Sequence, residues 1–206
     1  MNLRLTAAAL GALVAGGSMA YLLLGAPAPY TLRQGQSTST GKALVGGPFS
    51  LVDSTGKTVT DKDFRGRYLL VFFGYTFCPD VCPSGLQVIA AALDQLGPEA
   101  DKITPVFISI DPARDTPEKM GAYVKSFHPR MIGLTGSPAD VAAAIKAYRV
   151  YAKKVPDDRN PADYTMDHSS VVYLMGPAGD LVTFSAEIVK PDVLAQQLRK
   201  GLAVKG

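Results

Sequence analysis

Two continuous apolar runs constrain the fold of this chain more than any other feature of its sequence. Residues Tyr68 to Tyr75 (YLLVFFGY) and Thr104 to Ile110 (TPVFISI) carry no charge. Such runs are typical of strands that are buried on both faces of a sheet, as parallel strands usually are. The segment between them, Pro83 to Leu96, has a helical pattern, and its proline suits the first turn of a helix. Together these segments predict a βαβ unit.

The segments on either side of this unit predict the remainder of a mixed α/β domain. Before it, Phe49 to Val52 alternates apolar and polar residues and leads into a turn, so a short β-hairpin is expected to open the domain. After it, the patterns predict helices at Thr116 to Phe127, Ser137 to Tyr148 and Lys190 to Leu202, and strands at Val150 to Val155, Ser170 to Leu174 and Leu181 to Phe184. A βαβ crossover that is followed by an antiparallel hairpin and a helix is the thioredoxin-like plan. The expected fold class is therefore α/β, thioredoxin-like, with an N-terminal β-hairpin addition.

Residues 1–25 predict a membrane anchor that precedes this domain. Leu5 to Gly25 contain no charged residue, and such a segment spans ~32 Å as a helix, against ~30 Å of bilayer hydrocarbon. Arg4 lies before the run, which favours a cytoplasmic N-terminus and one transmembrane helix. The small residues of Ser18 to Ala20 leave open the alternative of a cleaved signal peptide. Residues 26–47, rich in Pro, Gly, Ser and Thr, predict a flexible linker, and residues 48–206 the folded domain.

The distribution of charge excludes several classes of function. The net charge is +3, and this excess lies before Gly46; from Gly46 onward, 18 basic residues face 18 acidic ones. A neutral domain disfavours nucleic acid as a partner. The chain has 2 cysteines, which excludes a four-cysteine zinc or iron–sulfur site. On the outer side of a membrane, two cysteines predict a disulfide, a redox pair or a pair of metal ligands.

The two cysteines, Cys78 and Cys82, lie in the loop that follows the first buried strand. At this CxxxC spacing they can face the same way as the chain enters a helix, and the helix N-terminus favours thiolates. Thiolates exchange disulfides and also bind soft metals such as Cu(I). The alternative is an inert structural disulfide, although so short a loop gains little from being closed.

A histidine, His168, stands just before a core strand, in a region where thioredoxin-like oxidoreductases usually carry a cis-proline; no proline lies between Ala162 and Gly176. Two thiolates and one imidazole make a soft three-coordinate site, suited to Cu(I) and tolerable for Cu(II). Asp167 is expected to orient the imidazole ring or to add charge behind it. The alternative for His168 is a surface or capping role. The other histidine, His128, is expected to cap a helix.

Four motifs resemble the Sco/SenC family of copper chaperones: Phe73 to Pro83, Phe107 to Pro112 with Arg114 to Pro117, Gly133 to Gly136, and Met166 to Ser169. They occur in the same order as in the family, between Gly46 and Phe184. The resemblance implies a thioredoxin-like domain that binds one copper ion, as Cu(I) or Cu(II), through Cys78, Cys82 and His168. It also implies that Asp167 matches the residue before the ligand histidine.

The resemblance further implies a function in building the CuA centre on subunit II of cytochrome c oxidase. The first hypothesis is a metallochaperone, which is not an enzyme, with other periplasmic copper chaperones as further candidate partners. The alternative is a thiol–disulfide reductase of the partner's metal-site cysteines, in which Cys78 attacks and Cys82 resolves the mixed disulfide. A thiol peroxidase is the least favoured. The N-terminus lacks an Arg-rich and Ser-rich transit peptide, so the expected location is the bacterial inner membrane, with the domain in the periplasm.

Overall fold

The computed structural model describes residues 45–157 and 160–203, which contain a seven-stranded sheet and a separate two-stranded one. The strands of the larger sheet lie in the order β2-β1-β5-β4-β3-β8-β9. Their bounds are β1 Ser50–Asp53, β2 Thr58–Thr60, β3 Tyr68–Gly74, β4 Ile103–Ser109, β5 Ile132–Thr135, β8 Val172–Met175 and β9 Leu181–Ser185. The helices are α2 Val81–Leu96, α3 Pro117–Lys125, α4 Pro138–Ala147 and α5 Pro191–Ala203, with short 3₁₀ turns η1 Asp61–Phe64 and η2 Gly97–Lys102. The fold is mixed α/β and thioredoxin-like, as predicted.

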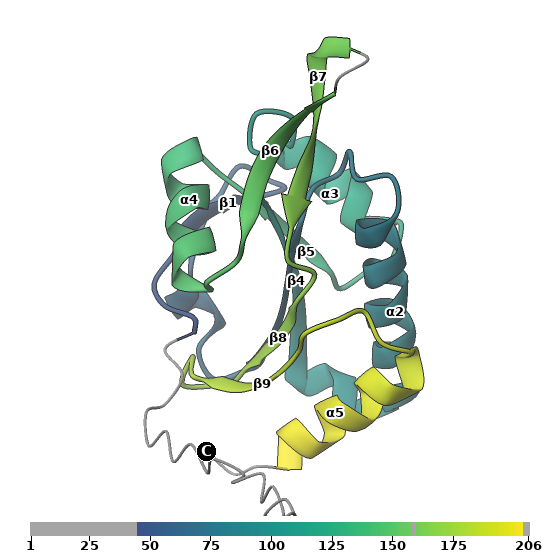
Figure 1. Ribbon diagram of the computed structural model, residues 1–206. Coiled ribbons are helices and arrows are strands. Elements are labelled where there is room, and N and C mark those ends of the chain that lie inside the picture. The colour runs from purple at the N-terminus through teal and green to yellow at the C-terminus, as the bar shows by residue number, and fades with distance from the viewer. Residues whose placement is uncertain (1–44, 158–159, 204–206) are drawn as a thin grey trace, which may run out of the picture. The chain divides into compact units, whose positions relative to one another are not determined.

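The central βαβ unit is confirmed. Strands β3 and β4 are parallel, in a register that runs from Tyr68 opposite Ile103 to Gly74 opposite Ser109. Helix α2 connects them and lies with α3 and α5 on one side of the sheet, while α4 lies on the other (Figure 1). Because both faces of β3 are covered, every one of its residues after Tyr68 is buried.

The predicted N-terminal hairpin is also confirmed, and it is part of the central sheet. Strand β1 pairs with β2 and, through Val52 and Asp53, also with β5, so the hairpin extends the central sheet. Strand β5 was not predicted, because four residues are too few for a pattern to stand out.

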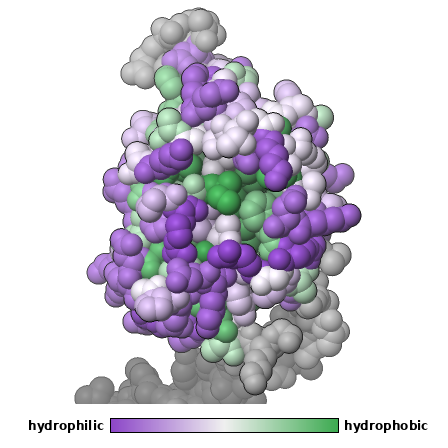
Figure 2. Space-filling view, turned by 180° about the vertical axis from the view of Figure 1, so that it is seen from behind, coloured by the Kyte–Doolittle hydropathy of each residue, from purple (hydrophilic) through white to green (hydrophobic). Residues whose placement is uncertain are grey.

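The hydrophobic core lies between the sheet and its helices. Phe72, Phe73 and Phe107 are fully buried, and the rings of Phe72 and Phe107 pack with their centroids 5.9 Å apart. Figure 2 shows the reverse of the view in Figure 1, where hydrophilic side chains surround a central apolar area. A core of this kind holds the carboxyl end of β3 rigid, which is the end that carries the two cysteines.

The two-stranded sheet consists of β6 (Ala152–Asp157) and β7 (Asn160–His168), and it projects from one end of the domain (Figure 1). A strand near Val150 to Val155 was predicted, but β7 was not, because its polar sequence lacks an apolar pattern. The pairing of Ala152 with His168 places His168 at the base of this hairpin. Tyr164, Met166 and His168 are partly buried, while Thr165 and Asp167 are exposed, as expected for alternation along a strand.

The predicted anchor and most of the predicted linker lie outside the described residues. Within residues 45–157 and 160–203, no helix is long and apolar enough to cross a membrane. The anchor, the linker and the domain boundaries therefore stay predictions.

Candidate metal centre

The two cysteines lie where β3 gives way to α2. Cys78 is partly exposed in the loop, and Cys82 is fully buried in the first turn of the helix. The backbone N–H of Cys82 donates a hydrogen bond to Cys78 Sγ at 3.3 Å. Neither cysteine forms a disulfide in this structure. Gly74 provides space for the buried sulfur, since a Cβ at this position would lie 2.7 Å from Cys82 Sγ.

The structure brings His168 to these sulfurs from the other sheet. His168 Nε2 lies 3.5 Å from Cys82 Sγ, and Nδ1 lies 3.1 Å from the carbonyl oxygen of Ser169. A carbonyl only accepts hydrogen bonds, so Nδ1 carries the proton and the Nε2 lone pair is directed toward the sulfurs. The ring of Tyr75 packs edge-on against the imidazole, with centroids 6.1 Å apart.

The three donor atoms form one compact group. The two sulfurs and a ring nitrogen of His168 all lie within 4.8 Å of one another. This is the group that was predicted, although Cys82 and His168 are 86 residues apart in the chain. A thiolate pair with one imidazole is a donor set for a soft metal ion, and the spacing of these atoms fits a single ion.

The two thiols differ strongly in acidity. The hydrogen bond with the side chain of Cys82 lowers the pKa of Cys78 to about 3. The pKa of Cys82 is raised, because the thiol of Cys82 is hydrogen-bonded to Cys78 and is buried. In the metal-free state the negative charge therefore lies on the exposed sulfur, and the proton on the buried one.

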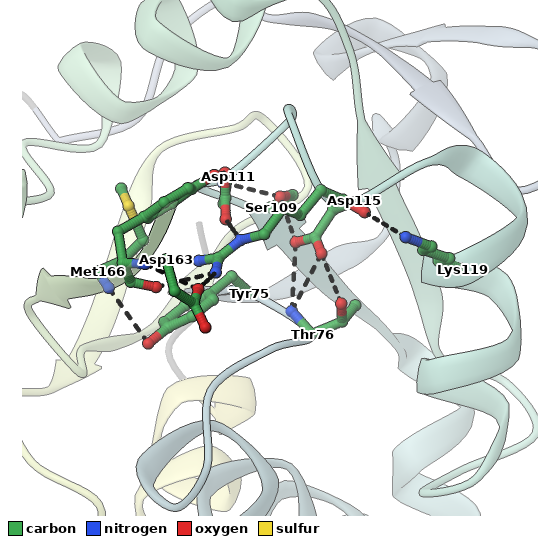
Figure 3. A network of polar contacts seen from close by, with 10 residues as sticks. Tyr75, Thr76, Ser109, Asp111, Asp115, Lys119, Asp163 and Met166 are labelled. Atoms are coloured by element: carbon green, nitrogen blue, oxygen red, sulfur yellow. Dashed lines mark hydrogen bonds and ion pairs between the residues drawn. The ribbon is translucent and has the colours of Figure 1, made fainter. Parts of the chain in front are cut away.

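A buried carboxylate, Asp115, supports the loop that carries the cysteines through hydrogen bonds to Thr76 (Figure 3). It accepts hydrogen bonds from the hydroxyl of Thr76 at 2.6 Å, from the backbone N–H of Thr76 at 3.2 Å and from the hydroxyl of Ser109 at 2.6 Å. Burial raises the pKa of Asp115. The next residue, Thr116, caps helix α3, and its side chain accepts a hydrogen bond from the backbone N–H of Lys119. The segment after β4 thus ends a strand, caps a helix and supports the cysteine loop.

Two further residues that were singled out in the sequence, Asp167 and His128, do not belong to the group of three donor atoms. Asp167 is exposed, lies opposite Lys153 in the hairpin and lines the same cavity as His168, but the carbonyl oxygen of Ser169 is the group that contacts the imidazole Nδ1. A role for Asp167 stays a prediction. His128 is buried in the turn after α3, where its Nδ1 accepts from the backbone N–H of Arg130 at 3.2 Å. Sequence reasoning missed Ser169, because a backbone carbonyl leaves no signal in the residue type.

The donor group opens onto a cavity of about 260 Å³, lined by residues of the cysteine loop and of β7. Cys78 and His168 reach this cavity, and Tyr75 and Met166 form part of its wall. Phe77, 58% exposed, and Val81, 42% exposed, are large apolar side chains that adjoin the cysteines in the chain. The exposed sulfur is therefore open to a partner, while the buried one is not.

A family model and several known proteins are similar to this chain over most of its length. The family model described as SCO1/SenC matches residues 37–203. Protein SenC of Rhodobacter capsulatus is 43% identical over 165 residues, which cover 79% of this chain and 73% of that protein. The human mitochondrial SCO1 homolog is 44% identical over 163 residues, 78% of this chain and 51% of that protein. The chain spans about half the length of such mitochondrial relatives.

Two solved structures that are similar to this chain contain bound copper. ScoI of Bradyrhizobium japonicum with copper bound matches with a TM-score of 0.69 and 49% identity, over 76% of this chain and 98% of that one. ScoI of Arabidopsis thaliana with copper bound matches with a TM-score of 0.72 and 43% identity, over 77% and 98%. From the family match, these identities and the shared fold, we conclude that this chain belongs to the SCO1/SenC family.

Proposed function

We propose that this protein is a copper metallochaperone that carries one copper ion as cargo on Cys78, Cys82 and His168. The observation that carries the proposal is the convergence of two sulfurs and an imidazole nitrogen within 4.8 Å. The donor chemistry suits the cargo, because thiolates bind soft ions such as Cu(I) and imidazole is also a copper ligand. The copper-bound ScoI structures of two relatives support the same assignment.

The two sulfurs would have different roles in copper binding and transfer. Cys78 has the lower pKa of the two and is partly exposed, so it is the ligand that a partner's incoming thiolate reaches first. Cys82 must give up a proton when it binds metal, and binding is therefore coupled to proton release. Transfer would proceed by ligand exchange, in which the exposed Cys78 is displaced before the buried Cys82.

The partner we propose is the CuA centre on subunit II of cytochrome c oxidase, with other periplasmic copper chaperones as further candidates. One structurally similar protein, BsSco, is described as a member of the Sco family of cytochrome c oxidase assembly proteins. With the predicted anchor in residues 1–25 and the linker in 26–47, the protein would be a single-pass protein of the bacterial inner membrane with its domain in the periplasm.

The test is an anaerobic Cu(I) titration of the reduced full chain in detergent, against a chromophoric chelator. We expect one copper per chain, with two sulfur ligands and one nitrogen ligand by X-ray absorption. Cys78→Ser, Cys82→Ser and His168→Ala should each weaken binding at least ~10-fold. His128→Asn changes the other histidine and should leave affinity within about twofold. Copper that is not retained, or that binds equally well to His168→Ala, contradicts the proposal.

A second function is favoured by the contrast between the two thiols. The Cys78 thiolate could attack a partner disulfide, forming a Cys78–partner disulfide and releasing one partner thiolate. Cys82 would then lose its proton and attack Cys78 Sγ, which releases the second partner thiol. The partner gains two electrons, and this chain is left with a Cys78–Cys82 disulfide. Cys82→Ser should trap the mixed disulfide with a peptide that carries two oxidised cysteines; Cys78→Ser is the control, and no trapped species contradicts this activity.

A further inference from the structure

We propose that Arg114 is a positioning residue that holds His168 within reach of the two cysteines. This inference rests on the proposed function, because it concerns the same three ligands. His168 belongs to β7, whose sheet is separate from the one that leads to the cysteines. The backbone joins His168 to Val172 of β8, and side-chain contacts between the hairpin and the rest of the domain also hold the imidazole near the sulfurs; Arg114 makes several of these contacts.

Arg114 holds the hairpin directly. Its Nη1 donates a hydrogen bond to the carbonyl oxygen of Tyr164 at 2.9 Å and lies 3.4 Å from Asp163 Oδ1. Its guanidinium carbon lies 3.7 Å from the centroid of the Tyr164 ring, which is a stacking contact. Both Asp163 and Tyr164 are in β7, the strand that ends at His168.

Arg114 holds the cysteine side as well. Its guanidinium carbon lies 4.7 Å from the centroid of Phe77, the residue before Cys78, and 5.6 Å from that of Tyr75. Its Nε donates to Asp111, whose carboxylate also accepts from the hydroxyl of Tyr164 at 2.8 Å. Figure 3 shows part of this network, with Asp111 after β4, Tyr75 after β3, and Asp163 and Met166 in β7.

The strand carries the effect from Tyr164 to His168. The two residues lie on the same face of β7, four residues apart, or ~13 Å along an extended strand. Between them, the backbone N–H of Met166 donates to the hydroxyl of Tyr75 at 3.2 Å. A lysine at position 114 keeps the charge but loses the planar fork and the stacking, so Arg114→Lys isolates the positioning.

The experiment is a double-mutant cycle on the reduced full chain. Cu(I) affinity is measured for wild type, Arg114→Lys, His168→Ala and the double variant. Arg130→Gln is the control, because Arg130 also joins distant segments, bonding Ala100 and Asp101 at a place remote from the cysteines. If Arg114 acts through His168, Arg114→Lys weakens copper binding ~10-fold and loses the nitrogen ligand in X-ray absorption. On the His168→Ala background its further effect is below about twofold.

Two results overturn the proposal: unchanged affinity in Arg114→Lys, or the same loss with and without His168. A metal-free readout separates this failure from that of the proposed function. In copper-free protein, hydrogen exchange of the Met166 amide should accelerate ~10-fold in Arg114→Lys and not in Arg130→Gln. If wild type holds no copper, the proposed function fails, and this exchange rate alone decides whether Arg114 positions the hairpin. If Arg114→Lys does not fold, Tyr164→Leu replaces it in the experiment, because this variant removes the ring on which Arg114 stacks. The results that support or overturn the proposal stay the same.

Discussion

Gly74 offers a sharp test of how tightly the buried sulfur is packed. It is the last residue of β3, and a Cβ at this position would lie 2.7 Å from Cys82 Sγ and 2.7 Å from Cε2 of Phe107. Ordinary contacts with a Cβ begin near 3.4 Å, so Gly74→Ala requires movements of several tenths of an ångström. Neither neighbour yields easily, because Phe107 is fully buried against two other rings and Cys82 is fixed in the first turn of α2.

The expected cost follows from overpacking. Inserting a methyl group into a well-packed core costs typically ~1–3 kcal/mol, and for a domain of this size ~2 kcal/mol lowers Tm by roughly 4–8 °C. The assay is thermal and urea unfolding of the reduced, copper-free chain, followed by Cu(I) titration. Because the sulfur itself is displaced, copper affinity should fall together with stability.

The matched control is Gly136→Ala. A Cβ at Gly136 would lie 3.4 Å from its nearest neighbours, the side chains of Asp140 and Leu51, which is close to an ordinary contact. We expect its stability to stay within ~0.5 kcal/mol of wild type and its copper affinity to be unchanged. If Gly74→Ala were as stable as Gly136→Ala and bound copper as tightly as wild type, the reasoning about a rigid sulfur pocket would be refuted.

Three further predictions concern the scaffold. Thr116→Ala removes the cap of α3 and should cost ~1 kcal/mol in urea unfolding; an unchanged midpoint would contradict the capping role. Asp115→Ala leaves the partly buried donors of Thr76 and the buried hydroxyl of Ser109 without their acceptor and should cost ~1–3 kcal/mol, whereas Asp101→Ala, at an exposed site, should cost much less. Burial lowers the pKa of His128. The unfolded chain therefore binds the extra proton first, so stability is complete above the ordinary pKa of ~6.5 and declines as pH falls below it. Unfolding midpoints measured between about pH 7 and 5 should show this decline in wild type and a shallower one in His128→Asn.

Much of the fold could be predicted because its strongest elements are locally encoded. The apolar run of β3 can be recognised as a buried strand without knowledge of its neighbours, and α2 has its own helical pattern. The elements that were missed lack such a signal. Strand β5 has four residues, and β7 exists because β6 pairs with it and because Asp111, Arg114 and Tyr75 hold it.

The sequence by itself determined which atoms can bind a soft metal. It contains two cysteines and two histidines, and the CxxxC spacing places both sulfurs at the start of one helix. It also distinguished His168 from His128, because His168 lies in the region where thioredoxin-like oxidoreductases usually carry a cis-proline, whereas His128 follows a predicted helix.

Only the tertiary structure decided how those atoms meet. Whether His168 reaches Cys82 depends on side chains from the loop after β3 and the segment after β4, which hold the separate hairpin in place. The unequal acidity of the two thiols likewise follows from burial and from hydrogen bonds between them. Distance, burial and hydrogen bonding between residues far apart in the chain are set by packing, and no local pattern of residues encodes them.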